Sequence, residues 1–522
     1  MLTGLGSIIG SGWLFGAWRA AGLAGPGAVW AWVLGAAIVT TIALTYAELG
    51  AMFPESGGMV RYSHYSHGTL LGFIGAWANW IAIVSVIPVE AEASVQYMAS
   101  WPYPWAQALY VHMPDGRGEL QGLGLVIAAV LVVVYFLLNF WSVRLFARSN
   151  AIITVFKMVV PAATALALIA SGFHPGNFSV GAAGGAYTPD FAAVLTAVAT
   201  AGIVFSYNGF QSPVNLAGEA RNPSRSVPFA VLGSIAIAAV IYVLLQVAYI
   251  GVVPPEKLAA AGWHGIDFRS PFAELALIVN LNWLAALLYA DAFVSPSGTG
   301  ITYTASTARM IYGMSRNGTL ATAFSRLHER YAVPRPAMWF NLAVSFLFLF
   351  FFRGWGKLAA VISVATIISY LNGPVSAISL RRTAARMHRP LRLPGLPVVS
   401  GLAFVFASEL LYWARWPLTG EVLLLILVAL PVYAYYHVRN RGEDLAQQFR
   451  GAAWLVTFLP TMAAISWAGS ERFGGHGLLP WGYDLVVVAV VALGFYIWGA
   501  RSGWETRALR EAQAQFASLQ SP

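Results

Sequence analysis

The fold is decided near the start of the chain, by residues 5–16, Leu5-Gly6-Ser7-Ile8-Ile9-Gly10-Ser11-Gly12-Trp13-Leu14-Phe15-Gly16. The stretch is apolar enough to lie in a membrane, yet four glycines and two serines interrupt it. Such a run favours an unwound helix, and unwound backbone at membrane depth is stable only inside protein or beside a cavity. The N–H groups of Ser11, Gly12 and Trp13 would begin a second half-helix, whose dipole favours an anion such as a carboxylate. The alternative is that these small residues allow another helix to pack closely.

The composition indicates a polytopic membrane protein. Of the 522 residues, 58% are hydrophobic and 10% are charged, and the mean hydropathy is +0.67. Cysteine is absent and the nine histidines fall in predicted loops or near span ends, so we expect no disulfide, metal site or cofactor. The net charge of +9 is spread over many short loops, which argues against a nucleic-acid partner.

Fourteen apolar runs are long enough to be membrane-spanning helices. They lie near residues 1–20, 27–53, 69–99, 121–141, 150–171, 191–218, 228–252, 284–310, 337–353, 356–380, 397–415, 418–438, 452–470 and 481–500. With the N-terminus inside, 21 Lys and Arg fall on the inner side, seven on the outer side and two within spans. This bias predicts a multi-pass protein of the cytoplasmic membrane with both termini in the cytoplasm.

The sixth span is interrupted like the first, in residues 202–213, Gly202-Ile203-Val204-Phe205-Ser206-Tyr207-Asn208-Gly209-Phe210-Gln211-Ser212-Pro213. Gly209 and Pro213 both weaken helical hydrogen bonding. Because the two spans are five apart, they run in opposite directions. Paired interrupted helices in inverted repeats indicate a transporter binding site at the membrane midplane. The alternative is two unrelated kinks.

These breaks predict where a small-molecule substrate binds. If the substrate is an amino acid, its carboxylate would meet the N–H groups at residues 10–12 and its amine the freed carbonyls of both spans. The candidate binding residues are Ile9, Gly10, Ser11, Gly12, Phe205, Ser206, Tyr207, Asn208 and Gly209.

Several separated motifs resemble the amino acid–polyamine–organocation (APC) permeases. The matching segments are Ile8-Ile9-Gly10-Ser11-Gly12, the stretch from Gly25-Pro26-Gly27 to Gly57-Gly58, and Phe205 to Phe210 followed by Gly218-Glu219-Ala220-Arg221-Asn222-Pro223. The resemblance covers about residues 1–380, although Trp13 stands where the family usually has an aliphatic residue. Residues 88–93 and 291–300 are most similar to a bacterial subgroup that includes aspartate:proton symporters.

The resemblance implies an all-α LeuT-type fold of five plus five inverted helices, with helices 1 and 6 broken. The ten-helix core would occupy residues 1–380, with repeats at about 1–175 and 190–380. A basic cytoplasmic loop at 381–396 would follow, then helices 11 and 12 at 397–438, two extra helices at 452–500, and a cytoplasmic tail at 501–522.

Lys157 is the candidate for proton coupling. It lies about a third of the way into the fifth span, where an ammonium group is costly and marks a functional site by default. The resemblance places it where sodium-coupled relatives bind an ion between helices 1 and 8. The alternative is a lysine whose ammonium reaches the membrane surface.

Other polar residues in the spans are candidates for gating or support. They are Arg19, Glu48, Glu90, Glu219, Asp291, Ser295 and Ser297. For Glu48 and Glu219, pairing with or capping by inner-loop arginines is the simpler interpretation. At least one of Glu90 and Glu92 should face the bundle rather than lipid.

The leading functional hypothesis is secondary active import of amino acids by proton symport, and the subgroup resemblance implies acidic substrates. Arg19, Lys157, Asn208 or a hydroxyl are the candidate donors to a side-chain carboxylate. An exchanger, a channel or facilitator, and a non-transporting sensor on the same fold remain alternatives. A membrane-embedded enzyme is disfavoured because no HExxH, clustered His, Cys or nucleotide-binding loop occurs, so no catalytic residue is predicted.

The first half-helix is short. Half of a bilayer core needs roughly ten helical residues, and only five precede Gly6. We therefore expect the natural product to begin further upstream, with roughly ten or more extra residues. The alternative is a shortened but working half-helix.

Overall fold

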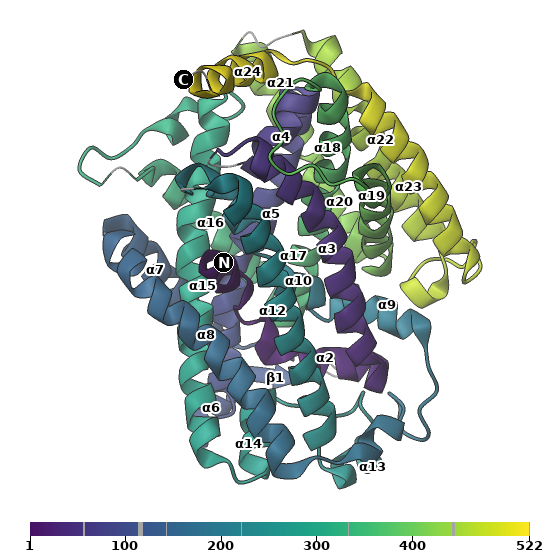
Figure 1. The fold of residues 1–522 in the computed structure, drawn as a ribbon. Coiled ribbons are helices and arrows are strands. Elements are labelled where there is room, and N and C mark those ends of the chain that lie inside the picture. The colour runs from purple at the N-terminus through teal and green to yellow at the C-terminus, as the bar shows by residue number, and fades with distance from the viewer. Residues whose placement is uncertain are drawn as a thin grey trace.

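A computed structural model describes residues 1–55, 58–112, 118–141, 143–220, 222–331, 333–440 and 444–520. The described chain forms one bundle of helices, elongated along most of its helix axes (Figure 1). Within these residues, ten segments are long and apolar enough to cross a membrane. The predicted all-helical polytopic architecture is therefore confirmed at this level.

The first half of the predicted core begins with a broken helix. Its elements are α1 (Leu2–Ile8), α2 (Gly12–Ala24), the 3-10 helix η1 (Gly25–Gly27), α3 (Ala28–Met52), α4 (Gly58–His67), α5 (Thr69–Met98), α6 (Pro104–Gln107), β1 (Tyr110–His112), β2 (Gly118–Leu120), α7 (Gly122–Trp141) and α8 (Val143–Gly172). Strands β1 and β2 form a small antiparallel hairpin with Tyr110 opposite Leu120. The sequence did not predict this hairpin, because its strands are only three residues long.

The second half repeats the broken pattern. Its elements are η2 (Pro175–Ser179), α9 (Phe191–Thr200), α10 (Ile203–Tyr207), α11 (Ser212–Asn215), η3 (Ala217–Glu219), α12 (Pro223–Val252), α13 (Pro255–Ala261), α14 (Pro271–Ile278), α15 (Asn282–Arg316), η4 (Thr322–Ser325), α16 (Arg335–Phe351), α17 (Trp355–Tyr370) and α18 (Asn372–Thr383). The helices α5 and α15 pack along each other, as do α3 and α12.

The remaining helices flank this core. They are α19 (Leu396–Trp413), α20 (Leu418–Leu427), α21 (Ala429–Arg439), α22 (Leu445–Ala468), η5 (Glu471–Phe473), α23 (Tyr483–Ser502) and α24 (Arg507–Gln520). In Figure 1, α22 and α23 form one side of the bundle, and α24 lies across the end that carries α4 and α18. The helices α13 and α14 lie at the opposite end.

Both predicted interruptions are real breaks in the backbone. The helix α1 ends at Ile8, Ile9 is extended with φ −84° and ψ 94°, and Ser11 caps α2. In the sixth span, Gly202 has φ +89° and Gly209 has φ +122°, a region that favours glycine. The expected single run at 191–218 is therefore divided into α9, α10 and α11.

Candidate functional site

The two breaks meet at a small cavity inside the bundle. It is lined by Ser7, Ile8, Gly10, Gly12, Val86, Glu90, Phe205, Asn208, Thr299 and Tyr303. Its volume of about 10 Å³ leaves room for roughly one water molecule. An amino acid can therefore enter only when some of the lining groups move.

The first break leaves backbone groups unpaired beside this cavity. The N–H of Ser11 donates to Glu90 Oε2 at 2.9 Å. In the part of the chain that the structure describes, the N–H groups of Gly10, Gly12 and Trp13 donate to no protein group. The carbonyls of Ser7 and Ile9 likewise accept no hydrogen bond from the described residues. Free donors thus begin α2, while free acceptors lie at the end of α1 and just after it.

Glu90 reaches the break from α5 and is fully buried. Its Oε1 has no hydrogen-bond donor among the described residues. A Cβ added to Gly10 would come within 2.6 Å of this oxygen, so glycine at position 10 permits the close approach. The carboxyl group of Glu90 therefore lies where part of a substrate is expected to bind.

Lys157 extends from α8 to the same region, where it is 2% exposed. Its ammonium donates to Thr299 Oγ1 of α15 at 2.7 Å and to the Gly6 carbonyl of α1 at 3.2 Å. The side chain therefore turns inward and does not reach the surface. Its ammonium thus lies between α1 and α15.

The second break is held by a side-chain network. The N–H of Gly209 donates to Gln211 Oε1 at 2.9 Å, and Gln211 Nε2 donates to Asn208 Oδ1 at 2.6 Å. The Tyr370 hydroxyl lies 3.1 Å from Gln211 Oε1 and 3.3 Å from Asn208 Oδ1. Gly209 itself packs against the backbone of Ser7, which joins the two breaks.

Aromatic rings close the α2 side of the cavity. The ring centroid of Trp355 lies 5.0 Å from that of Phe15 and 5.8 Å from that of Phe205. The Trp355 indole N–H donates to Ser11 Oγ at 2.8 Å. About two turns further along α2, Arg19 packs over Gly356 and forms no salt bridge within the described residues.

Of the nine predicted binding residues, four line the cavity: Gly10, Gly12, Phe205 and Asn208. The other five support the breaks. Ile9 is buried in the core, and Ser11 bonds to Glu90 and Trp355. Ser206 packs on Gly12, the Tyr207 hydroxyl donates to the Trp32 carbonyl at 3.3 Å, and Gly209 holds the second break.

The structure also places the predicted supporting residues. Glu48 forms a bidentate ion pair with Arg381 and lies away from the cavity, as its simpler interpretation predicted. Asp291 accepts a 2.6 Å hydrogen bond from Ser295, and Ser297 pairs with the Tyr135 hydroxyl at 3.0 Å. Both Glu90 and Glu92 are buried in the bundle. The side chain of Glu219 lies outside the described residues.

Sequence reasoning missed five lining residues, which are Ser7, Ile8, Val86, Thr299 and Tyr303. Thr299 lies in the run Gly298-Thr299-Gly300, where small residues let other groups approach. A Cβ on Gly298 would come within 3.3 Å of Lys157 Cε. That run of small residues within an apolar span was the available signal.

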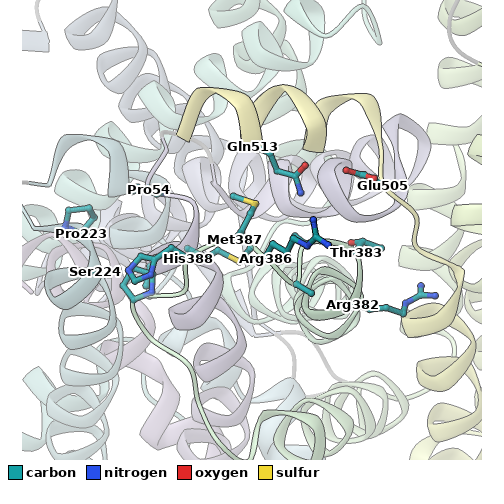
Figure 2. A pocket seen from close by; sticks show the side chains of 15 residues that line it. Pro54, Pro223, Ser224, Arg382, Thr383, Arg386, Met387, His388, Glu505 and Gln513 are labelled. Atoms are coloured by element: carbon teal, nitrogen blue, oxygen red, sulfur yellow. The ribbon is translucent and has the colours of Figure 1, made fainter. Parts of the chain in front are cut away.

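A larger hollow of about 680 Å³ lies elsewhere, between residues 382–390, the start of α12 and the C-terminal tail. Figure 2 shows Arg386 and His388 on one side of it and Gln513 of α24 above them. None of its lining residues belongs to either break. It is therefore separate from the candidate site.

Two broken helices with free backbone groups facing one buried cavity define a membrane transporter rather than an enzyme. The amino acid permease family model matches residues 2–441, and the chain belongs to that family.

Three proteins of Bacillus subtilis illustrate its relatives. The chain is 56% identical to the glutamate/serine transporter AimA, over 98% of this chain and 94% of that protein. It is 37% identical to the aspartate-proton symporter, over 96% and 95% of the two chains. It is 26% identical to the branched-chain amino acid permease BcaP, over 83% and 91%.

Proposed function

We propose that this permease imports amino acids with acidic or hydroxyl side chains, glutamate, aspartate and serine among them, by proton symport across the cytoplasmic membrane. The observation that carries the proposal is the cavity between the two breaks, with free N–H groups on one side and free carbonyls on the other. An amino acid has a carboxylate and an ammonium group to match both sets. The names of two relatives, the glutamate/serine transporter and the aspartate-proton symporter, support the choice of side chains.

In this arrangement the substrate carboxylate binds the N–H groups of Gly10, Gly12 and Trp13. The substrate ammonium binds the carbonyls of Ser7 and Ile9, close to the carboxylate of Glu90. The side chain then points toward the second break and α15, whose residues Asn208, Thr299 and Tyr303 line the rest of the cavity.

Lys157 is the proposed proton carrier. Its ammonium bridges α1 and α15 through Gly6 and Thr299. Loss of the proton weakens both contacts and frees α1 to move, whereas reprotonation restores them. Proton release would thus be tied to the movement that opens the site to one side of the membrane.

The proposal includes the finer architecture. The chain would have fourteen spans. Ten of them, in residues 1–380, would form a LeuT-type core of two inverted five-helix repeats. Two helices at 397–438 and two more at 452–500 would follow. The surplus of Lys and Arg near α4, α18 and α24 supports a cytoplasmic location for that end and for both termini.

Uptake by purified protein in proteoliposomes tests this function. We expect labelled glutamate, aspartate and serine to accumulate when the outside is acidic, and the accumulation to collapse with a protonophore. Uptake that only equilibrates, with or without a pH gradient, would identify a facilitator. Exchange without net accumulation would identify an exchanger, and binding without transport a sensor; each of these results contradicts the proposal.

A further inference from the structure

The amide group of Asn208 presents an unpaired donor to the cavity. Asn208 is 4% exposed and lines the cavity beside Gly10 and Gly12. Its Nδ2 donates to no group in the described part of the chain. A buried N–H without an acceptor costs free energy, so an unpaired donor at this position needs an explanation.

The network behind Asn208 fixes which end of its amide faces the cavity. The backbone N–H of Gly209 can only donate, so the atom it meets on Gln211 must be the oxygen. The other Gln211 atom is then Nε2, a donor, and the Asn208 atom it meets must be Oδ1. The Asn208 Nδ2 is left as the donor without an acceptor, and it cannot exchange places with Oδ1 without breaking this network.

Of the other polar side chains of the cavity, Ser7 has its donor occupied, because Ser7 Oγ donates to the Thr3 carbonyl at 3.0 Å. Thr299 Oγ1 accepts from Lys157 and keeps its own proton to donate. Glu90 is an acceptor when ionised. The hydroxyls of Tyr303 and Thr299 are therefore the competing donors, since neither has a hydrogen-bond acceptor among the described residues.

We infer that Asn208 Nδ2 is the specificity-determining donor that recognises an oxygen atom of the substrate side chain. This inference rests on the proposed function, because it requires that amino acids bind in this cavity. A neutral N–H donor accepts both a carboxylate and a hydroxyl oxygen, so a single group serves glutamate, aspartate and serine. An apolar side chain leaves the donor unpaired and is rejected.

Serine and alanine differ only in the hydroxyl group, so their relative affinities measure this contact. In proteoliposomes, inhibition constants of serine, alanine and glutamate are measured against exchange of labelled serine, for the wild type and Asn208→Ala. We expect the constants for serine and glutamate to rise, serine's by about tenfold and glutamate's by roughly tenfold to a hundredfold. The constant for alanine should change by less than about twofold.

Two further variants keep the test specific. Gln211→Glu removes the donor that holds Asn208 Oδ1, and because Gln211 is a positioning residue, this change should weaken the preference for serine over alanine by a smaller factor than Asn208→Ala does. Asn139→Ala is the matched control, because Asn139 is equally buried at 4% but donates to the carbonyls of Tyr135 and Ile301. It should leave the ratio unchanged.

The inference is overturned if Asn208→Ala shifts all three constants equally, since Asn208 would then have only a structural role. It is also overturned if Tyr303→Phe abolishes the preference for serine over alanine and Asn208→Ala does not. Exchange needs no pH gradient, so these results are independent of proton coupling. A wild-type protein that binds none of the three amino acids would instead refute the proposed function.

Discussion

At the scale of single residues, Lys157 connects two helices that move relative to each other in the proposed mechanism. Its ammonium contacts the Gly6 carbonyl of α1 and Thr299 of α15, and it has no carboxylate within salt-bridge distance among the described residues. Both contacts are hydrogen bonds to neutral oxygens, so α1 can leave the ammonium without separating a direct ion pair. This arrangement suits a link between helices that must be broken and remade once per cycle.

Replacing Lys157 with alanine should separate coupling from binding. We expect Lys157→Ala to abolish accumulation driven by a pH gradient, because the variant lacks the proposed proton carrier. Exchange of labelled for unlabelled substrate should persist, which also shows that the variant is folded. A variant that still concentrates substrate with a normal pH dependence would refute the role of Lys157.

Glu48 and Arg381 form a second important contact, between α3 and α18. Two hydrogen bonds of 2.6 and 2.8 Å join them, and Glu48 is only 2% exposed. Arg381→Ala leaves that buried carboxylate without its charged partner, with the Leu393 N–H still donating to it, and should lower the free energy of unfolding by about 3–5 kcal/mol. The exposed pair of Arg472 and Asp190 is the matched control, where Arg472→Ala should cost roughly 0–1 kcal/mol.

Thermal unfolding in detergent measures both changes. The double variant Glu48→Gln/Arg381→Gln should recover part of the stability, because it removes the unpaired charge. Equal losses for the buried and the exposed arginine would show that the buried pair has no special structural role.

At the scale of elements, Gly209 is where the two broken spans touch. Its φ of +122° is a conformation that favours glycine, and an added Cβ would come within 2.6 Å of the Ser7 carbonyl carbon. Both obstacles are backbone features, so side-chain rotation cannot relieve them. The contact therefore requires glycine at position 209.

We expect Gly209→Ala to push α1 away from the second break and to reduce transport by at least about tenfold, the effect of roughly 1.4 kcal/mol. Gly313→Ala in α15 is the control, because an added Cβ there has no neighbouring atom within 4 Å. Initial uptake rates, normalised to the amount of protein in the membrane, compare the two variants. A Gly209→Ala protein with normal uptake would show that the contact is dispensable.

The sequence predicted the breaks, because glycine and serine within an apolar run have a clear physical meaning. It also predicted an intramembrane role for Lys157, and the structure places this side chain in the interior. It did not predict that Glu90 would accept from the Ser11 N–H, since the two residues are 79 positions apart. Nor did it separate the four cavity-lining residues from the five that support the breaks, because that depends on side-chain direction.

At the scale of the whole molecule, the C-terminal helices are fastened to α4. The backbone N–H of Trp504 donates to the Ser66 carbonyl at 3.1 Å, and Thr506 Oγ1 donates to the Tyr65 carbonyl at 2.8 Å. His67 lies beneath this contact, fully buried, with its ring nitrogens against Ser66 Oγ and the Gly499 carbonyl. The end of α23 and the residues that follow it thus hold the short helix α4 in place.

The contribution of this contact between α4 and the C-terminal segment to stability should decrease in acid. Burial lowers the pKa of His67 to about 4, and burial likewise lowers the pKa of His64 to about 4. Both side chains are neutral in the folded protein, so their contribution is complete above about pH 6.5 and is lost as the pH falls from about 6.5 toward 4.

We therefore expect the melting temperature in detergent to fall as the pH decreases across this window. His67→Gln keeps a donor for the Gly499 carbonyl but does not titrate. The fall in melting temperature between about pH 6.5 and 4 should therefore be about half as large in this variant. His174→Gln, at an exposed histidine, is the control. A pH dependence unchanged by His67→Gln would contradict the role of burial.

If Lys157 is the proton carrier, as we propose, the ammonium between α1 and α15 also determines how voltage acts on transport. With Lys157 as the only carrier, one proton accompanies each substrate. Glutamate and a proton cross as a neutral pair, whereas serine and a proton carry one positive charge. One charge moved through 100 mV is worth about 2.3 kcal/mol, roughly a fiftyfold concentration ratio. An inside-negative potential imposed with valinomycin should therefore increase serine accumulation and leave glutamate accumulation unchanged, and an equal response of both would show that additional charge moves.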